Sequence, residues 1–324
     1  MKVGAEVIKK YGIFLVLIIL VVFFSCASDA FLHQSNLFNV ARQVSMLGIA
    51  AVGMTFALLL GGIDLSIGSQ ITLVNIVAAW LMVRAGIDPI LASCIAIALA
   101  VFLGFINGWS VANLGMPPLI VTLCSMTVLE GVAYIISKGI PIFGFPPSFA
   151  VIGQGYVGVV PIPVIIMIVI LAAGSFILNK TYFGRYFYAV GGNEEASLLS
   201  GINVKRVKYL AYTLSGLFAG IAGIVMLSRT NSGQPLAGKG FEFDVLTAAV
   251  LGGVSVNGGI GKISNVVAGV FIIGVLSNGL ILLDVSSYVQ MVIKGLVLFV
   301  AVAFDCLQKG GKLSIKFLQS PPKL

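Results

Sequence analysis

The segment GRYFYAVGGNEEASLLSGINVKRVK, residues 184–208, organises the rest of the chain. It is the longest polar stretch between two long apolar runs, and it carries Arg185, Lys205, Arg206 and Lys208. Lys and Arg gather in the cytoplasmic loops of membrane proteins. We therefore predict a cytoplasmic loop, covering about 180–208, between two membrane-spanning helices.

The middle of this loop has the start and stop signals of a short helix. Asn193 can cap the first turn through its side-chain oxygen. Glu194 and Glu195 follow, where carboxylates suit the positive end of the helix dipole. Gly201 can end the helix in the left-handed conformation that other residues resist.

A helix of about two turns takes most of its stability from packing. The apolar side chains Ala196, Leu198 and Leu199 are therefore predicted to dock on another surface. That surface is either the protein itself or the lipid headgroups in one interpretation, and a cytoplasmic partner in the other. The spacing of the residues does not separate the two interpretations.

The composition indicates an all-α integral membrane protein. Hydrophobic residues make up 59% of the chain, charged residues 9%, and the mean hydropathy is +1.12. Soluble domains carry about 25% charged residues. The apolar runs continue from end to end, which predicts a single transmembrane domain over residues 1–324. The net charge of +8 indicates no nucleic-acid partner, because the basic residues gather at the chain ends and in the central loop.

The apolar runs predict about ten transmembrane helices, some of them broken or re-entrant. They lie at about 11–27, 43–60, 65–83, 89–112, 117–137, 161–179, 208–228, 243–257, 263–283 and 287–305. The eighth is short and rich in glycine. The basic N-terminus and the terminal lysines predict that both ends are cytoplasmic; these lysines are Lys309, Lys312, Lys316 and Lys323. The first run reads as a span that serves as its own insertion signal, with a cleaved signal peptide as the alternative.

Two loops are predicted on the outer side, at 138–163 and 230–243. The first contains five prolines and cannot be one continuous helix. Two small-residue faces, at Gly104 and Gly108 and at Gly216 and Gly220, predict closely packed helices. Glycine pairs near 61, 252 and 258 interrupt the spans, which is typical of a transport pathway.

Asp64 lies between two apolar runs, where an unpaired carboxylate is costly. The favoured interpretation is that Asp64 or Ser66 caps the helix that follows. The alternative is that Asp64 lines the cytoplasmic end of a translocation pathway.

Glu130 and Lys294 lie deeper within predicted spans, where each needs a polar partner. They can pair with each other, or Lys294 can reach Asp284 or Asp305. Uncharged hydrogen-bonding side chains also occur in or near the spans: Asn75, Asn107, Asn113, Asn278 and Gln290. Bonds between helices are the first interpretation of these. A corridor for a neutral, polyhydroxylated substrate is the second.

No recognisable ATP site is present in the sequence. The segment GGIGKIS at 258–264 lacks the first glycine of the phosphate-binding loop, and Ile263 stands where Ser or Thr must bind magnesium. With His33 as the only histidine, a His-based metal site has too few ligands. The four scattered cysteines are predicted to be small core residues. No motif indicates an enzyme. If the chain is a transporter, the energy for transport is expected to come from a partner ATPase or from an ion gradient.

Six strings in order resemble the ribose-type ABC importer permeases of bacteria. They are GGIDLSIGS at 61–69, PPLIVTL at 117–123, GRYFYAVGGNEEA at 184–196, SGQP at 232–235, VLGGVSVNGGIG at 250–261 and VSSYVQMVIKGLV at 285–297. The resemblance covers nearly the whole chain. It implies the permease subunit of an ATP-driven importer for a monosaccharide or similar small polyol, in the bacterial inner membrane.

The resemblance also implies partners and sites. A second permease copy (the same chain or a close paralogue), an ABC ATPase that binds ATP and Mg²⁺, and a periplasmic or lipid-anchored sugar-binding protein complete the assembly. The loop helix is implied to insert into the ATPase through Gly191, Gly192, Asn193, Glu194, Glu195, Ala196, Leu199 and Gly201. Candidate pathway residues are Asp64, Asn75, Asn107, Glu130, Asn278 and Lys294. Glu130 departs from the usual pattern of the family, so the resemblance assigns it no role.

Three other interpretations stay open. One is an ABC permease for branched-chain amino acids or a signalling molecule. Another is a secondary transporter driven by protons or sodium, with Asp64, Glu130 and Lys294 as its coupling groups. The last is a membrane scaffold that transports nothing.

Overall fold

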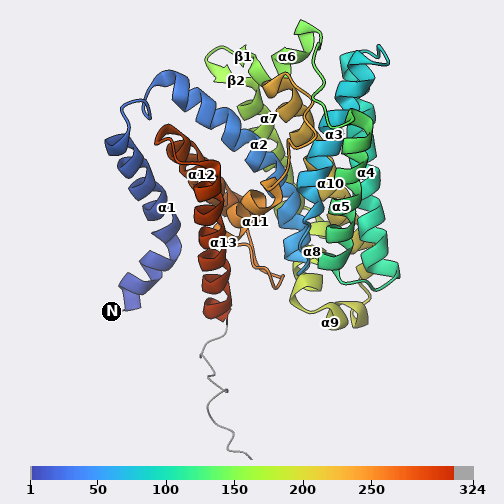
Figure 1. Cartoon of the computed structure of the whole chain (residues 1–324). Helices are drawn as coiled ribbons and strands as arrows, with labels where there is room; N and C mark the ends of the chain where they lie inside the picture. The colour runs from blue at the N-terminus through green and yellow to red at the C-terminus, as the bar shows by residue number, and fades with distance from the viewer. Residues whose placement is uncertain (1, 310–324) are drawn as a thin grey trace, which may run out of the picture.

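The computed structural model describes residues 2–309, with the side chains of residues 12–307. It is almost entirely helical (Figure 1). The helices are α1 (Lys2–Ala27), α2 (Gln34–Leu59), α3 (Ser66–Val83), α4 (Pro89–Asn113), α5 (Pro118–Ser137), α6 (Pro147–Gln154), α7 (Ile162–Lys180), α8 (Tyr182–Gly192), α9 (Glu194–Leu199), α10 (Val204–Thr230), α11 (Phe241–Leu251), α12 (Ile263–Leu282) and α13 (Ser287–Lys309). Two short strands, β1 (Tyr156–Val157) and β2 (Val160–Pro161), pair antiparallel. The predicted tail lysines Lys312, Lys316 and Lys323 lie outside the described residues.

Eight of the helices within residues 2–309 are long and apolar enough to cross a membrane: α2, α3, α4, α5, α7, α10, α12 and α13. The apolar part of α1, Gly12–Ala27, is shorter. The predicted eighth span at 243–257 is wrong as a full helix, because α11 has 11 residues. At 1.5 Å per residue such a helix is about 17 Å long, roughly half the thickness of a bilayer core.

A segment of turns without helix, residues 231–240, precedes α11 and lies along α3. The Gln234 amide donates to Asn75 Oδ1 at 2.9 Å, and the Gly238 amide donates to Thr72 Oγ1 at 2.9 Å. Non-helical backbone is tolerated at membrane depth where protein buries it and satisfies its polar groups. The segment predicted as the second outer loop is therefore held against α3 by hydrogen bonds.

The predicted glycine faces bring α4 and α10 into close contact. A Cβ atom at Gly104 would lie 2.3 Å from the Tyr212 carbonyl oxygen, and one at Gly216 would lie 2.3 Å from that of Ala100. Any larger residue would push the helices apart. The prediction of close helix packing is confirmed, and it locates the contact between these two helices.

The two ends of the bundle differ. Figure 1 shows α6, β1 and β2 at one end, and α9 at the other together with the start of α1 and the end of α13. At the first end the two predicted outer loops meet, since Ile142 and Gly233 exchange backbone hydrogen bonds of 2.9 and 2.8 Å. As predicted, the proline-rich loop is not one helix.

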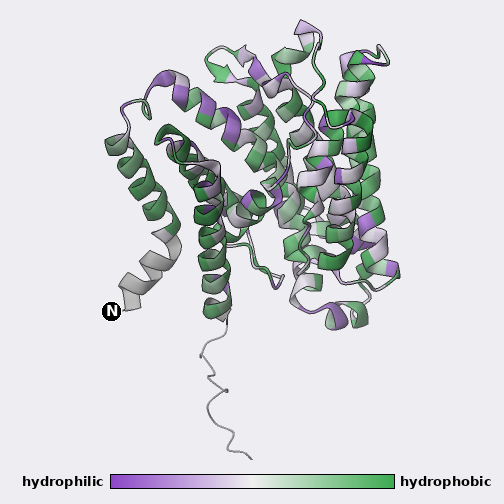
Figure 2. Cartoon of the chain, viewed as in Figure 1, coloured by the Kyte–Doolittle hydropathy of each residue, from purple (hydrophilic) through white to green (hydrophobic). Residues whose placement is uncertain are grey.

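The outer faces of the long helices are apolar (Figure 2). The cysteines lie on these faces, so the prediction that they are core residues is wrong: Cys26, Cys94, Cys124 and Cys306 are all exposed. Lipid tails are as apolar as a protein core. A small apolar side chain is therefore as suitable on the outside of a membrane helix as on the inside.

Candidate functional site

The polar loop forms α8 and α9 between the long helices α7 and α10, and the predicted helix signals are confirmed. Asn193 Oδ1 accepts a hydrogen bond of 2.8 Å from the Ala196 amide, in the first turn of α9. Gly201 has a φ of +83°, so its backbone ends the helix in the left-handed conformation. The chain then turns directly into α10.

The described part of the chain leaves most of the apolar surface of α9 uncovered. Leu198 is 63% exposed and Leu199 is 83% exposed, and Ala196 is also exposed. Polar contacts hold the helix instead, since Lys208 Nζ lies 2.7 Å from Glu194 Oε1 in an ion pair. The helix thus rests on its own chain through buried Ser197 and this ion pair, and its two leucines stay mostly exposed. Lipid headgroups and a partner protein remain as the surfaces that can cover it.

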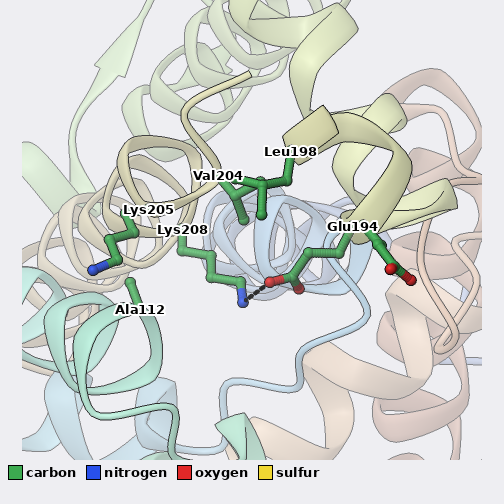
Figure 3. A pocket seen from close by; sticks show the side chains of 7 residues that line it. Ala112, Glu194, Leu198, Val204, Lys205 and Lys208 are labelled. Carbon is green, nitrogen blue, oxygen red and sulfur yellow. Dashed lines mark hydrogen bonds and ion pairs between the residues drawn. The ribbon is translucent and has the colours of Figure 1, made fainter. Parts of the chain in front are cut away.

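A cavity of about 450 Å³ lies between α9, the end of α4 and the start of α10. Figure 3 shows Leu198 and Val204 beside it, with the ion pair between Lys208 and Glu194 crossing its wall. The remaining lining residues are Ala112, Glu195 and Lys205. Both apolar and charged groups are therefore available here to a partner.

The two glycines at the end of α8 differ in how closely other atoms pack against them. A Cβ atom at Gly191 would lie 1.7 Å from the Leu59 carbonyl oxygen. A Cβ atom at Gly192 would meet no atom of the described residues within 4 Å. One turn earlier, Tyr188 Oη donates a hydrogen bond of 2.8 Å to the Gly261 carbonyl oxygen. Burial raises the pKa of the Tyr188 phenol, so this group keeps its proton and stays a donor.

Asp64 lies fully buried in the turn between α2 and α3. Its Oδ1 accepts from the Ser66 amide at 3.0 Å and from Ser66 Oγ at 2.5 Å. Its Oδ2 accepts from Ser215 Oγ on α10 at 2.6 Å. The helix-capping interpretation of Asp64 is confirmed, and the carboxylate also joins α3 to α10.

The Ser66 hydroxyl extends these contacts to α4 and α5. Ser66 Oγ accepts from Gln70 Nε2 at 2.8 Å and from Asn107 Nδ2 at 3.0 Å. Asn107 in turn accepts from Ser125 of α5. We name this buried set the Asp64 network; its members are Asp64, Ser66, Gln70, Asn107, Ser125 and Ser215. It links four long helices, α3, α4, α5 and α10.

Two buried polar atoms beside the Asp64 network have no hydrogen-bond partner among the described residues: Tyr212 Oη and Gln70 Oε1. Buried polar groups are rarely left unpaired in native proteins. Small polar molecules such as water are the natural partners of such atoms.

The other predicted asparagines have structural partners. Asn278 on α12 and Asn36 on α2 bond to each other in both directions, at 2.8 and 3.0 Å. Asn75 holds the 231–240 segment by accepting a hydrogen bond from the Gln234 amide, as described above. The interpretation of these residues as hydrogen bonds between packed elements is confirmed for both.

The predicted pairing of Glu130 with Lys294 is wrong, as is pairing of Lys294 with Asp284 or Asp305. Lys294 Nζ on α13 lies 2.6 Å from Asp244 Oδ2 on α11. Glu130 lies on α5, half-buried, close enough to the buried Glu242 for their charges to interact. Of the six predicted pathway residues, the structure therefore joins Asp64 and Asn107 and leaves the other four apart from them.

Comparison with known proteins assigns the family. Residues 36–302 match the family described as branched-chain amino acid transport system / permease component. The chain is 44% identical over 301 residues to the ribose import permease protein RbsC of Bacillus subtilis (strain 168), covering 92% of this chain and 93% of that protein. The chain belongs to the family of ribose-type ABC importer permeases.

Further relatives carry other names. The permease is 38% identical over 300 residues to the D-allose transport system permease protein AlsC of Escherichia coli (strain K12), covering 92% of each chain. It is 38% identical over 317 residues to the L-arabinose transport system permease protein AraH of the same strain, covering 94% of this chain and 93% of that protein. No solved structure matches it.

Proposed function

We propose that the permease is the membrane-spanning subunit of an ATP-driven importer for a monosaccharide or a similar small polyol. The names of its relatives include three monosaccharides: ribose, D-allose and L-arabinose. The Asp64 network supports a neutral substrate. Its hydroxyl and amide groups suit a polyhydroxylated molecule, and its one carboxylate is already engaged by hydrogen bonds.

In this proposal α9 is the contact with an ABC ATPase, which binds ATP and Mg²⁺ on its own chain. The observation that carries the assignment is the exposure of Leu198 and Leu199 on a helix too short to be stable alone. Burial of these side chains by a partner would supply the packing that the permease does not. Gly191, Gly192, Asn193, Glu194, Glu195, Ala196, Leu199 and Gly201 form or flank this contact.

The topology follows from the basic loop. With α9 on the cytoplasmic side, the start of α1 and the end of α13 are cytoplasmic as well, because they lie at the same end of the bundle (Figure 1). Ten crossings result when α1 is counted and when 231–240 and α11 together form the eighth. The protein is then a multi-pass, single-domain component of the bacterial inner membrane.

The remaining partners follow from this orientation. The end with α6 and the β1–β2 hairpin faces outwards and receives a periplasmic or lipid-anchored sugar-binding protein. A second permease copy, identical or a close paralogue, packs against the exposed apolar helices. Both partners are proposed from the family.

A second substrate class has one observation in its favour, which is that the description of the matched family names branched-chain amino acids. Uptake into right-side-out membrane vesicles, loaded with ATP and supplied with the binding protein, separates the two classes. We expect ATP-dependent uptake of a labelled monosaccharide that unlabelled ribose, allose or arabinose reduces and leucine does not. Competition by leucine alone would assign the amino-acid class.

An ion-coupled transporter is the alternative mechanism. Two of its three candidate coupling groups have structural partners, since Asp64 caps α3 and Lys294 pairs with Asp244. In the same vesicles, we expect uptake to persist when an ionophore collapses the proton and sodium gradients and to stop when ATP is withheld. Uptake that follows the gradient without ATP would contradict the proposed function.

A further inference from the structure

Three segments that are far apart in the sequence meet where α8 ends. They are the end of α2 with the turn after it (59–61), the last part of α8 (188–192) and the loop between α11 and α12 (257–261). The Gly259 amide donates a hydrogen bond of 2.9 Å to the Leu59 carbonyl oxygen, which ties the first segment to the third. We name these three segments the glycine junction.

The junction is a contact of backbone on backbone. Gly191 approaches Leu59 so closely that a Cβ atom would lie 1.7 Å from its carbonyl oxygen. A Cβ atom at Gly258 would lie 2.7 Å from the Gly61 amide nitrogen and 2.8 Å from the Gly191 carbonyl oxygen. No side chain fits between the three segments, so nothing compressible separates them. This packing requirement also accounts for the GGIG string that superficially resembles a phosphate-binding loop.

Hydrogen bonds hold the loop in the junction from two sides. Tyr188 Oη of α8 donates to the Gly261 carbonyl oxygen at 2.8 Å. On the other side, Asp305 Oδ2 of α13 accepts from Ser255 Oγ at 3.1 Å and from the Val256 amide at 3.3 Å. A displacement of α8 therefore moves the loop with it, and the loop is tied to the last helix.

The glycine junction lies close in the sequence to both α9 and the Asp64 network. Gly191 comes two residues before Asn193, the cap of α9. Leu59 comes five residues before Asp64, the centre of the buried network. Close-packed interiors have low compressibility and transmit strain. A push on α9 would thus reach the Asp64 network through α8 and the turn after α2, without passing through flexible side chains.

We propose that the glycine junction is the joint that passes movement of α9 to the Asp64 network, with Gly191 and Tyr188 as its positioning residues. The proposal rests on the proposed function, because it takes α9 as the ATPase contact. It assigns Gly191 a role separate from ATPase docking. The exposed leucines bind the partner, and the junction converts that binding into a change at the pathway.

The test compares Gly191→Ala with Gly131→Ala in the complete transporter, reconstituted with its ATPase and binding protein. Gly131 is an exposed glycine within α5, and a Cβ atom there would meet no atom of the described residues within 4 Å. For each variant, ATPase retention, ATP hydrolysis and sugar uptake are measured together. We expect both variants to retain the ATPase, because neither changes the exposed face of α9. Sugar transported per ATP hydrolysed falls about tenfold or more for Gly191→Ala, since its methyl group forces the backbones apart. Gly131→Ala keeps the ratio of the wild type, because its methyl group meets no neighbouring segment.

Tyr188→Phe applies the same test with a smaller change, and it serves if Gly191→Ala does not fold. It removes one hydroxyl from the junction, so we expect transport per ATP to fall about twofold to tenfold, the range for one ordinary hydrogen bond. Tyr182→Phe on the exposed side of the same helix is the matched control and keeps the ratio. A folded Gly191→Ala or Tyr188→Phe chain with wild-type transport per ATP overturns the joint. Loss of ATPase binding in the wild type instead overturns the proposed function.

Discussion

Truncation of Leu199 to alanine tests the contact at α9 most quantitatively. The change removes three carbon atoms from a side chain that is 83% exposed in the isolated permease. At about 0.8 kcal/mol for each buried carbon, a partner that covers Leu199 gains about 2 kcal/mol from these atoms. Their loss weakens ATPase binding by about 30-fold. Leu198, at 63% exposed, gives about 1.5 kcal/mol by the same reasoning.

The assay is a binding titration of the purified ATPase against the permease in detergent or nanodiscs. Leu236→Ala is the matched control, because Leu236 is also half-exposed but belongs to the 231–240 segment. We expect wild-type affinity for that control. All three variants should unfold at the wild-type temperature, since exposed substitutions change stability by no more than about 0.5 kcal/mol. A folded Leu199→Ala permease with wild-type ATPase affinity would refute the contact at α9.

Three further predictions concern charged groups. Glu194→Lys together with Glu195→Lys weakens ATPase binding in a pull-down without unfolding the permease, because the one ion pair that it breaks, Glu194 with Lys208, is at the surface and contributes no more than about 1 kcal/mol. Normal binding by the folded double variant would remove these residues from the contact. Lys294→Met lowers the free energy of unfolding by about 1–3 kcal/mol, because it leaves Asp244 unpaired. Adding Asp244→Asn restores most of this stability in thermal melts. A double variant as unstable as Lys294→Met would show that the ion pair contributes nothing. Asp64→Ala leaves three hydrogen-bond donors without an acceptor and destabilises the fold by about 1–3 kcal/mol. Asp64→Asn keeps an acceptor oxygen, so it destabilises the fold less. Equal melting temperatures for the two variants would contradict the role of Asp64 as a hydrogen-bond acceptor.

Local sequence signals predicted local structure well. Asn193 and Gly201 mark the ends of α9 because capping and the left-handed turn depend on nearest neighbours. The glycine faces on α4 and α10 likewise indicated close packing, since small residues are what close packing needs. The sequence did not indicate that these two faces meet each other.

Partners across the fold were not predictable in the same way. Lys294 was within reach of several acidic residues by position along the chain, and tertiary packing selected Asp244 from the neighbouring helix. Ser66 and Ser215 were missed as members of the Asp64 network, because serine in an apolar helix usually bonds to its own backbone. Such contacts depend on the rotation of each helix about its axis and on which helices pack together. The spacing of residues along the sequence gives neither.

The predicted eighth span shows that an apolar stretch of sequence need not be one continuous helix. Hydropathy predicted a helix at 243–257, but the helix begins at Phe241, ends at Leu251 and follows the turns of 231–240. Hydropathy measures how apolar a segment is, and backbone satisfied by Asn75 and Thr72 can be buried without being helical. The glycines of 231–240 were the signal that could have located this segment.

The measurement that tests the central claim most directly is a mild-detergent pull-down of the tagged permease from its native membrane, with mass identification of the bound proteins. We expect a stoichiometric ATPase with a phosphate-binding loop, lost when the α9 segment (residues 192–201) is altered and kept when the 231–240 segment is altered. A permease that is recovered alone, folded and after gentle extraction, would contradict the account and make ion coupling through Asp64, Glu130 and Lys294 the mechanism to test.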